Sequence, residues 1–297
     1  MSAGTTRVAG VELGGTKIIA VVADGREVLV RQQWPTGEDA PATLAAVASW
    51  LEQAKRTHGF DALGIASFGP LCLDRDRADF GRILDTPKAG WSGADVVGTL
   101  GGRLGVPVGF DTDVAGAALA EGLWGASVGC AVHVYLTIGT GIGGGIVIDG
   151  KPLHGAIHPE IGHVRVRRSP GDDFAGACPV HGDCLEGLAS GPAIALRAGC
   201  AAEEIAPSHP MWSRIASEIA ELMQMLILTL SPHRIVVGGG VGFGQAHLLA
   251  KVRSATAEGL AHYLPGQSVA DLEQIIVPAR LGADSGVFGA LALADRA

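Results

Sequence analysis

The same order of sequence patterns occurs twice in this chain of 297 residues, and the repeat constrains the fold more than any other feature. An apolar run enters a glycine turn at Val11–Lys17, and a second apolar run follows it to Asp24-Gly25. Leu136–Gly141 begins the same series, which ends at Asp149-Gly150. The spacing is close to half the chain, whereas solenoid repeats recur every ~20–50 residues. The repeat therefore predicts two related domains.

Strand-like patterns alternate with helix-like patterns in each half, which is typical of the α/β class. The predicted strands are Arg7–Leu13, Lys17–Ala23, Glu27–Gln33, Ala62–Ser67, Val106–Phe110, Ala131–Ile138, Gly145–Ile148, Arg234–Val237 and Gln274–Pro278. The predicted helices are Ala40–Thr57, Ala115–Leu123, Met211–Leu230 and Asp284–Asp295, the last capped by Asp284 or Ser285. We expect an N-terminal lobe over residues 1–121, completed by a C-terminal helix at 282–297, and a C-terminal lobe over residues 122–281. Because no long linker separates them, the lobes should pack together with a cleft between them.

The charge balance argues against two classes of partner. The chain has 22 Lys and Arg against 30 Asp and Glu, a formal net charge of −8. A chain this acidic is a poor candidate for binding nucleic acid or an anionic membrane surface. We therefore expect no nucleic-acid partner and no membrane partner, and any bound phosphate must be held by local backbone groups.

The start of the chain, its longest apolar stretch and its cysteines predict a cytoplasmic protein. Met1–Arg7 lacks the apolar core of an export signal. The longest apolar stretch, near Leu222–Leu230, is far shorter than the ~18 residues that a membrane span requires. Five cysteines form a sparse, odd-numbered set, which indicates reduced thiols with metal ligation as an alternative.

Three glycine clusters follow apolar runs. A strand that ends in a glycine turn can direct backbone N–H groups at phosphate oxygens. The clusters are neither Walker A loops nor convincing Rossmann fingerprints, and tight turns without a ligand are the alternative. Three such turns fit a nucleotide held between two lobes. The candidate phosphate-binding residues are Gly14, Gly15, Thr16, Lys17, Thr137, Gly139, Thr140, Gly141, Gly238, Gly239 and Gly240.

Four possible metal ligands are spaced for chelation: His163, Cys178, His181 and Cys184. A Cys-x2-His-x2-Cys knuckle with one further histidine suits tetrahedral Zn²⁺ with a closed coordination shell, which is a structural site. The alternative is scattered thiols and a surface histidine. Glu160 and Glu186 flank the knuckle, where they are either ligand-binding groups or ordinary surface carboxylates.

Asp113 lies between a predicted strand and a predicted helix. A carboxylate at this position gains from the helix dipole and could serve a reaction. The alternative is a plain helix N-cap, which is a common role of aspartate. Spacing alone favours the cap, and Asp111 is an alternative cap or a supporting group.

In order and over essentially the whole chain, these motifs resemble the sugar kinases of the ROK family within the actin–hexokinase–Hsp70 superfold. The segments that carry the resemblance are Glu12–Lys17, Phe110–Ala115, Thr137–Gly145, Glu160–His163, Cys178–Glu186 and Val236–Gly242. Thr86–Trp91 and His158–Glu160 are similar to the fructokinase branch. Departures from the usual pattern are Glu12 for Asp, Thr112 for Asn and Ala115 for Asn.

The resemblance implies a two-lobed actin/hexokinase-like (ribonuclease H-like) fold with duplicated mixed-sheet domains and an interdomain cleft. It implies a fructokinase, which phosphorylates the 6-hydroxyl of D-fructose with ATP and Mg²⁺, and a homodimer. Asp113 would be the catalytic base, and a structural Zn²⁺ would hold the loop 160–186. The implied sugar-binding residues are Thr112, Glu160, His163 and Glu186, with His163 also a zinc ligand.

Other functions remain open at this point. Within the family, the substrate could be glucose, mannose or N-acylmannosamine. A sugar-responsive repressor would carry a helix-turn-helix ahead of the first glycine turn, and the few residues before Val11 leave no room for one. A sugar-binding protein without catalysis is disfavoured because Lys17 and Asp113 are both present.

Overall fold

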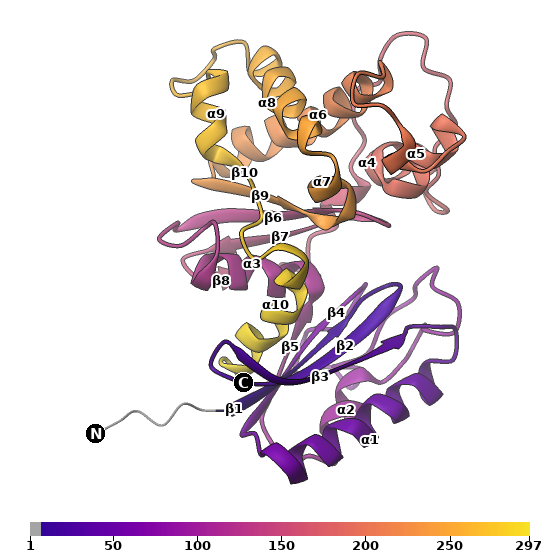
Figure 1. Ribbon diagram of the computed structural model, residues 1–297, viewed down its shortest axis with the longest axis vertical. Helices are drawn as coiled ribbons and strands as arrows, with labels where there is room; N and C mark the ends of the chain where they lie inside the picture. Colours follow the sequence, from indigo (N-terminus) through magenta and orange to yellow (C-terminus); the bar gives the residue numbers. More distant parts are fainter. Residues whose placement is uncertain (1–6) are drawn as a thin grey trace. The chain divides into compact units, whose positions relative to one another are not determined.

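The computed structural model describes residues 7–297, and residues 1–6, where no export signal was expected, lie outside the described part. The chain divides into two compact units (Figure 1). The first unit contains the described residues up to Leu123, together with Pro152–His158 and Asp284–Ala297. The second unit contains Trp124–Lys151 and Pro159–Ala283.

The first unit is built on a five-stranded mixed sheet in the order β3-β2-β1-β4-β5. Strand β1 is antiparallel to β2 and parallel to β4, and β4 is parallel to β5. The strands are β1 (Arg7–Leu13), β2 (Lys17–Asp24), β3 (Glu27–Pro35), β4 (Ala62–Ser67) and β5 (Val108–Thr112). Helices α1 (Ala40–His58) and α2 (Val96–Gly101) share one apolar core with the sheet, and α10 (Ser285–Ala294) belongs to another.

Two glycines explain how α10 packs so closely against this sheet. A Cβ on Gly64 of β4 would lie 1.8 Å from the carbonyl oxygen of Ala290. A Cβ on Gly109 of β5 would lie 2.0 Å from the carbonyl oxygen of Leu293. Because glycine has no side chain, the helix backbone can rest directly on the two strands. Part of the high glycine content therefore serves packing rather than ligand binding.

The second unit repeats the topology of the first. Its sheet has the order β10-β9-β6-β7-β8, and β6 is antiparallel to β7 and parallel to β9, as β1 is to β2 and β4. The strands are β6 (Val132–Ile138), β7 (Ile142–Ile148), β8 (Lys151–Pro152), β9 (Arg234–Gly238) and β10 (Ile276–Pro278). The duplication of mixed-sheet domains that the sequence predicts is confirmed.

The remaining helices come between strands in the sequence. Helices α6 and α8 contribute many of the buried apolar side chains in the core of the second unit. The helices are α3 (Asp113–Trp124), α4 (Leu185–Ala189), α5 (Gly191–Ala198), α6 (Met211–Leu230), α7 (Gly239–Gly244), α8 (Ala246–Leu260) and α9 (Val269–Ile275).

Most of the predicted element boundaries hold to within a few residues. The helix Met211–Leu230 and the strand Ala62–Ser67 are confirmed as predicted. The strand expected from Gln274 begins only at Ile276, because α9 continues to Ile275. Asp284 is the N-cap residue of α10, but its side chain makes no capping hydrogen bond.

Strand β5 also differs from the prediction. It was expected to end at Phe110, but it continues to Thr112, which pairs with Ser67 of β4. Asp111 therefore belongs to the strand and not to the turn that follows it. Asp113 is the first residue of α3.

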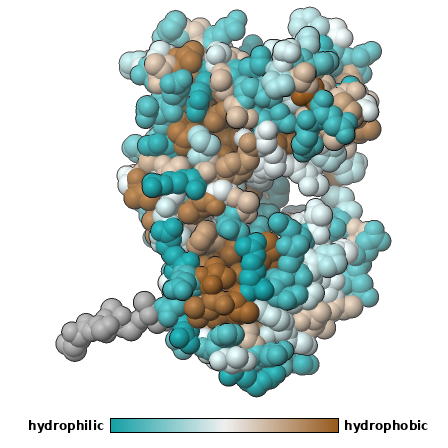
Figure 2. Space-filling model, in the orientation of Figure 1, coloured by the Kyte–Doolittle hydropathy of each residue, from teal (hydrophilic) through white to brown (hydrophobic). Residues whose placement is uncertain are grey.

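The surface carries apolar as well as polar side chains (Figure 2). Val28 and Leu29 of β3, for example, are each 38% exposed. Exposed apolar side chains are normal, because more than half of a folded protein's surface is apolar. No helix within residues 7–297 has both the length and the apolarity needed to cross a membrane.

Candidate active site and metal centre

The turn from β5 to α3 presents Asp113 at the beginning of a helix. Thr112 Oγ1 accepts the backbone N–H of Ala115 at 3.1 Å, which is the hydrogen bond of an N-cap. Asp113 Oδ1 accepts the N–H of Val114 at 2.9 Å. Thr112 thus performs the capping role that was the alternative for Asp113. Asp113 is an acidic residue in the first turn of α3.

Both carboxylate oxygens of Asp111 form hydrogen bonds. Oδ1 accepts the N–H of Thr112 at 2.7 Å, and Oδ2 lies 2.8 Å from Nε2 of His154. The hydrogen bond with Asp111 raises the pKa of His154, although partial burial acts against it. Sequence reasoning found no partner for His154, because the two residues are 43 positions apart. Asp111 therefore lies in β5 and does not cap α3.

A second histidine of the same segment is also anchored in the first unit. His158 is buried, and its Nε2 accepts the backbone N–H of Leu71 at 2.9 Å. The segment Pro152–His158 is therefore attached to this unit at both His154 and His158. No local sequence pattern signals this attachment.

The first glycine turn joins β1 to β2. Gly14 donates its N–H to the carbonyl oxygen of Lys17 at 3.0 Å, and Thr36 Oγ1 donates to the carbonyl oxygen of Gly14 at 2.6 Å. Gly15, Thr16 and Lys17 are exposed. The hydrogen bond from Thr36 therefore holds the turn at Gly14, while the next three residues are open to solvent.

Glu12 lies just before this turn. Burial raises its pKa, while the charges of Lys17 and Arg31 act in the opposite direction. Its Oε2 is buried and has no hydrogen-bond partner. A buried carboxylate oxygen without a partner costs free energy, so a positively charged or hydrated group beside it would stabilise it.

The second and third glycine clusters lie together in the second unit. Gly139 closes the β6–β7 turn through its N–H bond to the carbonyl oxygen of Gly141 at 2.9 Å. A Cβ on Gly139 would lie 3.5 Å from the backbone nitrogen of Gly240. Gly239 has φ +82°, a conformation that favours glycine. The turn is also bonded by Glu186, whose Oε2 accepts the N–H of Ile142 at 3.0 Å.

The four predicted metal ligands converge in the second unit. One ligand atom of each lies within 4.8 Å of all the others. Nδ1 of His163 is 3.3 Å from Nδ1 of His181, 3.5 Å from Sγ of Cys184 and 3.8 Å from Sγ of Cys178. Around a tetrahedral zinc, with bonds of about 2.3 Å to sulfur and 2.0 Å to nitrogen, neighbouring ligand atoms lie about 3.3–3.8 Å apart. The donor set and its spacing therefore fit Zn²⁺.

The knuckle itself is a tight backbone structure. Cys178 and Gly182 exchange two backbone hydrogen bonds, of 3.1 and 2.9 Å. A Cβ on Gly176 or Gly187 would lie within 2.0 Å of the Gly182 carbonyl oxygen. Burial raises the pKa of the Cys184 thiol. The glycines bring the backbone close enough for both cysteines to face the same point.

Glu160 precedes the 3-10 helix Ile161–His163, which carries one of the four ligands. Partial burial raises the pKa of Glu160, and the charge of Glu186 adds to the effect. The two carboxylates are thus close enough to interact electrostatically. The carbonyl oxygen of Glu160 accepts the backbone N–H of His163 at 3.1 Å, and the charge of Glu186 acts on the Cys184 thiol.

Gly162→Ala tests how tightly this short helix is held. Its Cβ would lie 1.7 Å from the carbonyl oxygen of Ile142, so Glu160 and His163 must move with the backbone. Overpacking of this kind costs about 1–3 kcal/mol, which lowers Tm by roughly 2–12 °C. Gly244→Ala is the matched control, because a Cβ there meets nothing within 4 Å. Equal Tm values for the two variants, by thermal denaturation, would contradict the close contact.

A buried ion-pair cluster fixes the loop that follows His163. Arg197 of α5 bonds both oxygens of Glu218 of α6, at 2.8 and 2.9 Å, and reaches Asp172 at 2.9 Å. Burial raises the pKa of Glu218, against the effect of Arg197. The three side chains are between 1 and 4% exposed. Because breaking one partner leaves a buried charge uncompensated, the cluster holds Asp172 and its loop firmly.

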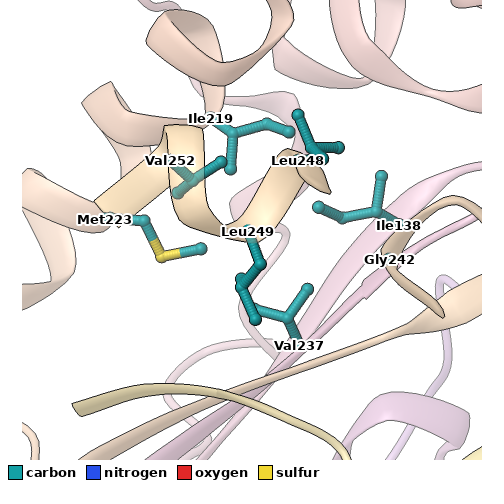
Figure 3. A pocket seen from close by; sticks show the side chains of 8 residues that line it. All are labelled: Ile138, Ile219, Met223, Val237, Gly242, Leu248, Leu249 and Val252. Atoms are coloured by element: carbon teal, nitrogen blue, oxygen red, sulfur yellow. The ribbon is translucent and has the colours of Figure 1, made fainter. Parts of the chain in front are cut away.

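The cavity in Figure 3 is not a candidate site. It has a volume of about 10 Å³ and lies among side chains of β6, α6, β9, α7 and α8. A cavity needs roughly 10–15 Å³ and several polar partners to hold even one water molecule. The lining is apolar throughout: Ile138, Ile219, Met223, Val237, Gly242, Leu248, Leu249 and Val252. It is a small packing gap in the core.

The comparisons with known proteins agree with this geometry. A profile of the ROK family matches residues 8–297. The chain belongs to the ROK family. The fructokinase of Zymomonas mobilis is 47% identical over 290 residues, which cover 96% of this chain and 95% of that protein.

Two solved ROK structures share the fold. The ROK hexokinase of Thermus thermophilus has a TM-score of 0.77 at 29% identity, with 98% of both chains covered. A ROK glucokinase of Streptomyces griseus, solved in complex with glucose and AMPPNP, has a TM-score of 0.76 at 26% identity, with 98% of this chain and 100% of that chain covered. The expected actin/hexokinase-like fold is therefore confirmed.

Proposed function

We propose that this chain is an ATP-dependent fructokinase, which converts D-fructose to fructose 6-phosphate. The observation that carries the proposal is the 47% identity with a fructokinase over 96% of the chain. The structure supports it with a carboxylate at a helix start, glycine turns in both units and two interacting carboxylates near the candidate metal centre.

Asp113 is the proposed catalytic base. In the reaction, the 6-hydroxyl oxygen of fructose forms a bond to the γ-phosphorus of ATP, and the bond from that phosphorus to the β–γ bridging oxygen breaks. The hydroxyl proton passes to the Asp113 carboxylate, and ADP leaves. Thr112 caps the helix through its bond to Ala115, so Asp113 is not the N-cap residue.

ATP is the proposed phosphate donor, bound by the glycine turns. In the first unit, Gly15, Thr16 and Lys17 are exposed, and Lys17 adds a positive charge. In the second unit, the turn at Gly139–Gly141 lies beside Gly240. Mg²⁺ bound to the phosphates would neutralise part of their charge, and the unpartnered Oε2 of Glu12 suits contact with its water shell.

The proposed sugar ligands are Thr112, Glu160, His163 and Glu186. Carboxylates accept hydrogen bonds from sugar hydroxyls, and a site of this kind rejects a stereoisomer that leaves a buried group unpaired. The Zn²⁺ site is proposed to be structural, because the four protein ligands leave no open position for a substrate. Its role would be to fix Glu160 and Glu186 in place.

We expect kcat/KM for fructose to exceed that for glucose by ~100-fold. Two mispaired hydroxyl contacts at about 1.4 kcal/mol each give this factor, because 1.4 kcal/mol is a factor of ten. Mannose is the expected second substrate. The measurement is a coupled ADP-release assay with fructose, mannose, glucose and N-acetylmannosamine.

The same assay decides between fructose and the nearest alternative. One similar structure is a glucokinase with glucose bound, so glucose is the sugar to test against. A tenfold preference for glucose or an N-acyl sugar would reassign the substrate and leave the kinase activity standing.

We further propose that the enzyme acts in the cytoplasm as a homodimer. Analytical ultracentrifugation can test the oligomeric state.

A further inference from the structure

The pair formed by buried Asp111 and partly exposed His154 has no role in the mechanism described so far. Nε2 of His154 lies 2.8 Å from Oδ2 of Asp111, whose side chain is 8% exposed, while that of His154 is 30% exposed. A carboxylate this deeply buried costs free energy unless hydrogen bonds satisfy its oxygens. His154 supplies one of the two partners of Asp111, and the backbone of Thr112 supplies the other.

The pair is connected to the proposed base through adjacent residues. Asp111 accepts the N–H of Thr112, and Thr112 accepts the N–H of Ala115 to begin α3. Asp113 directly follows Thr112, the residue that takes part in both hydrogen bonds. A displacement of the Asp111 carboxylate would therefore move the turn that carries Asp113.

His154 is suited to be the positively charged partner of the Asp111 carboxylate. Its hydrogen bond with Asp111 raises its pKa, partial burial opposes this, and a bond with the Leu153 backbone adds to the increase. Asp111 on β5 is the charged group that acts on it, and the neighbouring His158 is occupied as an acceptor for Leu71. A charge-assisted hydrogen bond is stronger than a neutral one, so the imidazolium holds Asp111 most firmly.

We propose that His154 is a positioning residue for phosphoryl transfer, which acts by holding Asp111 and, through it, the Thr112–Asp113 turn. The inference rests on the proposed function, because it names what keeps the proposed base in place. It also assigns a role to the segment Pro152–His158, whose chain neighbours on both sides belong to the other unit.

The test compares three variants with the wild type. His154→Ala removes the hydrogen bond, and His154→Gln retains a neutral donor of similar reach. Ile157→Ala is the control, because this side chain of the same segment is 58% exposed. A misplaced catalytic group typically costs up to about 100-fold in rate. We expect His154→Ala to lower kcat by about 10- to 100-fold with little change in KM for ATP, and free imidazole to restore part of the loss.

The pH dependence gives a readout that a purely structural role would not change. The wild-type kcat should decline as pH rises through the increased pKa of His154, because the bond loses its charge. His154→Gln should retain most of the kcat at neutral pH and lack this decline. The contribution of His154 to the free energy of unfolding depends on pH in the same direction. It is complete below the ordinary histidine pKa of ~6.5, and it is lost as pH rises through the increased pKa that His154 has in the folded protein.

The outcomes separate this inference from the proposed function. If the wild type phosphorylates fructose and His154→Ala keeps kcat within twofold, the positioning role is wrong and the kinase assignment stands. If Ala and Gln variants lose activity equally and in step with Tm, the pair is only structural. If the wild type phosphorylates no hexose, the proposed function fails first.

Discussion

Asp113→Asn should lower kcat for fructose by about 10²–10⁴-fold, which is the typical contribution of a general base. The amide keeps the size of the side chain and can still accept the N–H of Val114, so the start of α3 should remain intact. The amide cannot accept the hydroxyl proton. The measurement is kcat from steady-state kinetics, with fructose binding by calorimetry, which should change much less than kcat.

Two controls sharpen this experiment. Asp76→Asn removes a charge from an exposed loop of the same unit and should leave kcat unchanged. Asp111→Asn should have a smaller effect than Asp113→Asn if Asp111 only supports the turn. A near wild-type kcat in Asp113→Asn would return Asp113 to a purely structural role at the start of α3.

Local patterns explain why much of the fold could be predicted. The Asp149-Gly150 turn joins β7 to β8 with both residues at positive φ, which is the conformation that this dipeptide favours in two-residue hairpins. The duplication was visible because each half repeats strand, glycine turn and strand. Boundaries failed where two patterns overlap, as at Ile276, where an apolar run is shared by the end of α9 and the beginning of β10.

The site was predictable only where its residues are close in sequence or carry a distinctive donor set. The spacing of Cys178, His181 and Cys184 already indicates chelation, and the structure brings His163, the fourth predicted ligand, to the same point. The bond between Asp111 and His154 links segments 43 residues apart, and a single histidine carries no periodic signal. The predicted strand ended at Phe110, so the burial of Asp111 within β5, and its need for a partner, became visible only in the structure.

Glycine content shows a further limit of reading function from sequence. The clusters were interpreted as ligand loops, and the second and third do lie side by side. Gly64 and Gly109, by contrast, serve the close packing of α10 on the first sheet. Both roles depend on the missing side chain, so composition alone cannot distinguish a phosphate loop from a helix contact.

Removal of metal from the four-residue cluster should produce the second large effect. We expect about one zinc per chain in the purified protein, by mass spectrometry of the metal. A ligand that binds only the folded state at roughly 1,000 times its Kd stabilises it by about 4 kcal/mol. Chelation should therefore lower Tm by about 8–16 °C, at 2–4 °C for each kcal/mol. It should also raise KM for fructose, because Glu160 and Glu186 flank the cluster.

Variants of single cysteines and histidines distinguish the effect of metal loss from a general effect on the fold. His181 is exposed, so His181→Ala removes a ligand without opening a cavity, and it should lower zinc content and Tm together. Cys184→Ser alters a fully buried ligand and should have the larger effect. Cys200→Ser is the matched control, because this cysteine of the same unit lies outside the cluster. Active protein that contains no zinc, with a Tm unaffected by chelation, would show that the four side chains hold the loop by packing and hydrogen bonds alone.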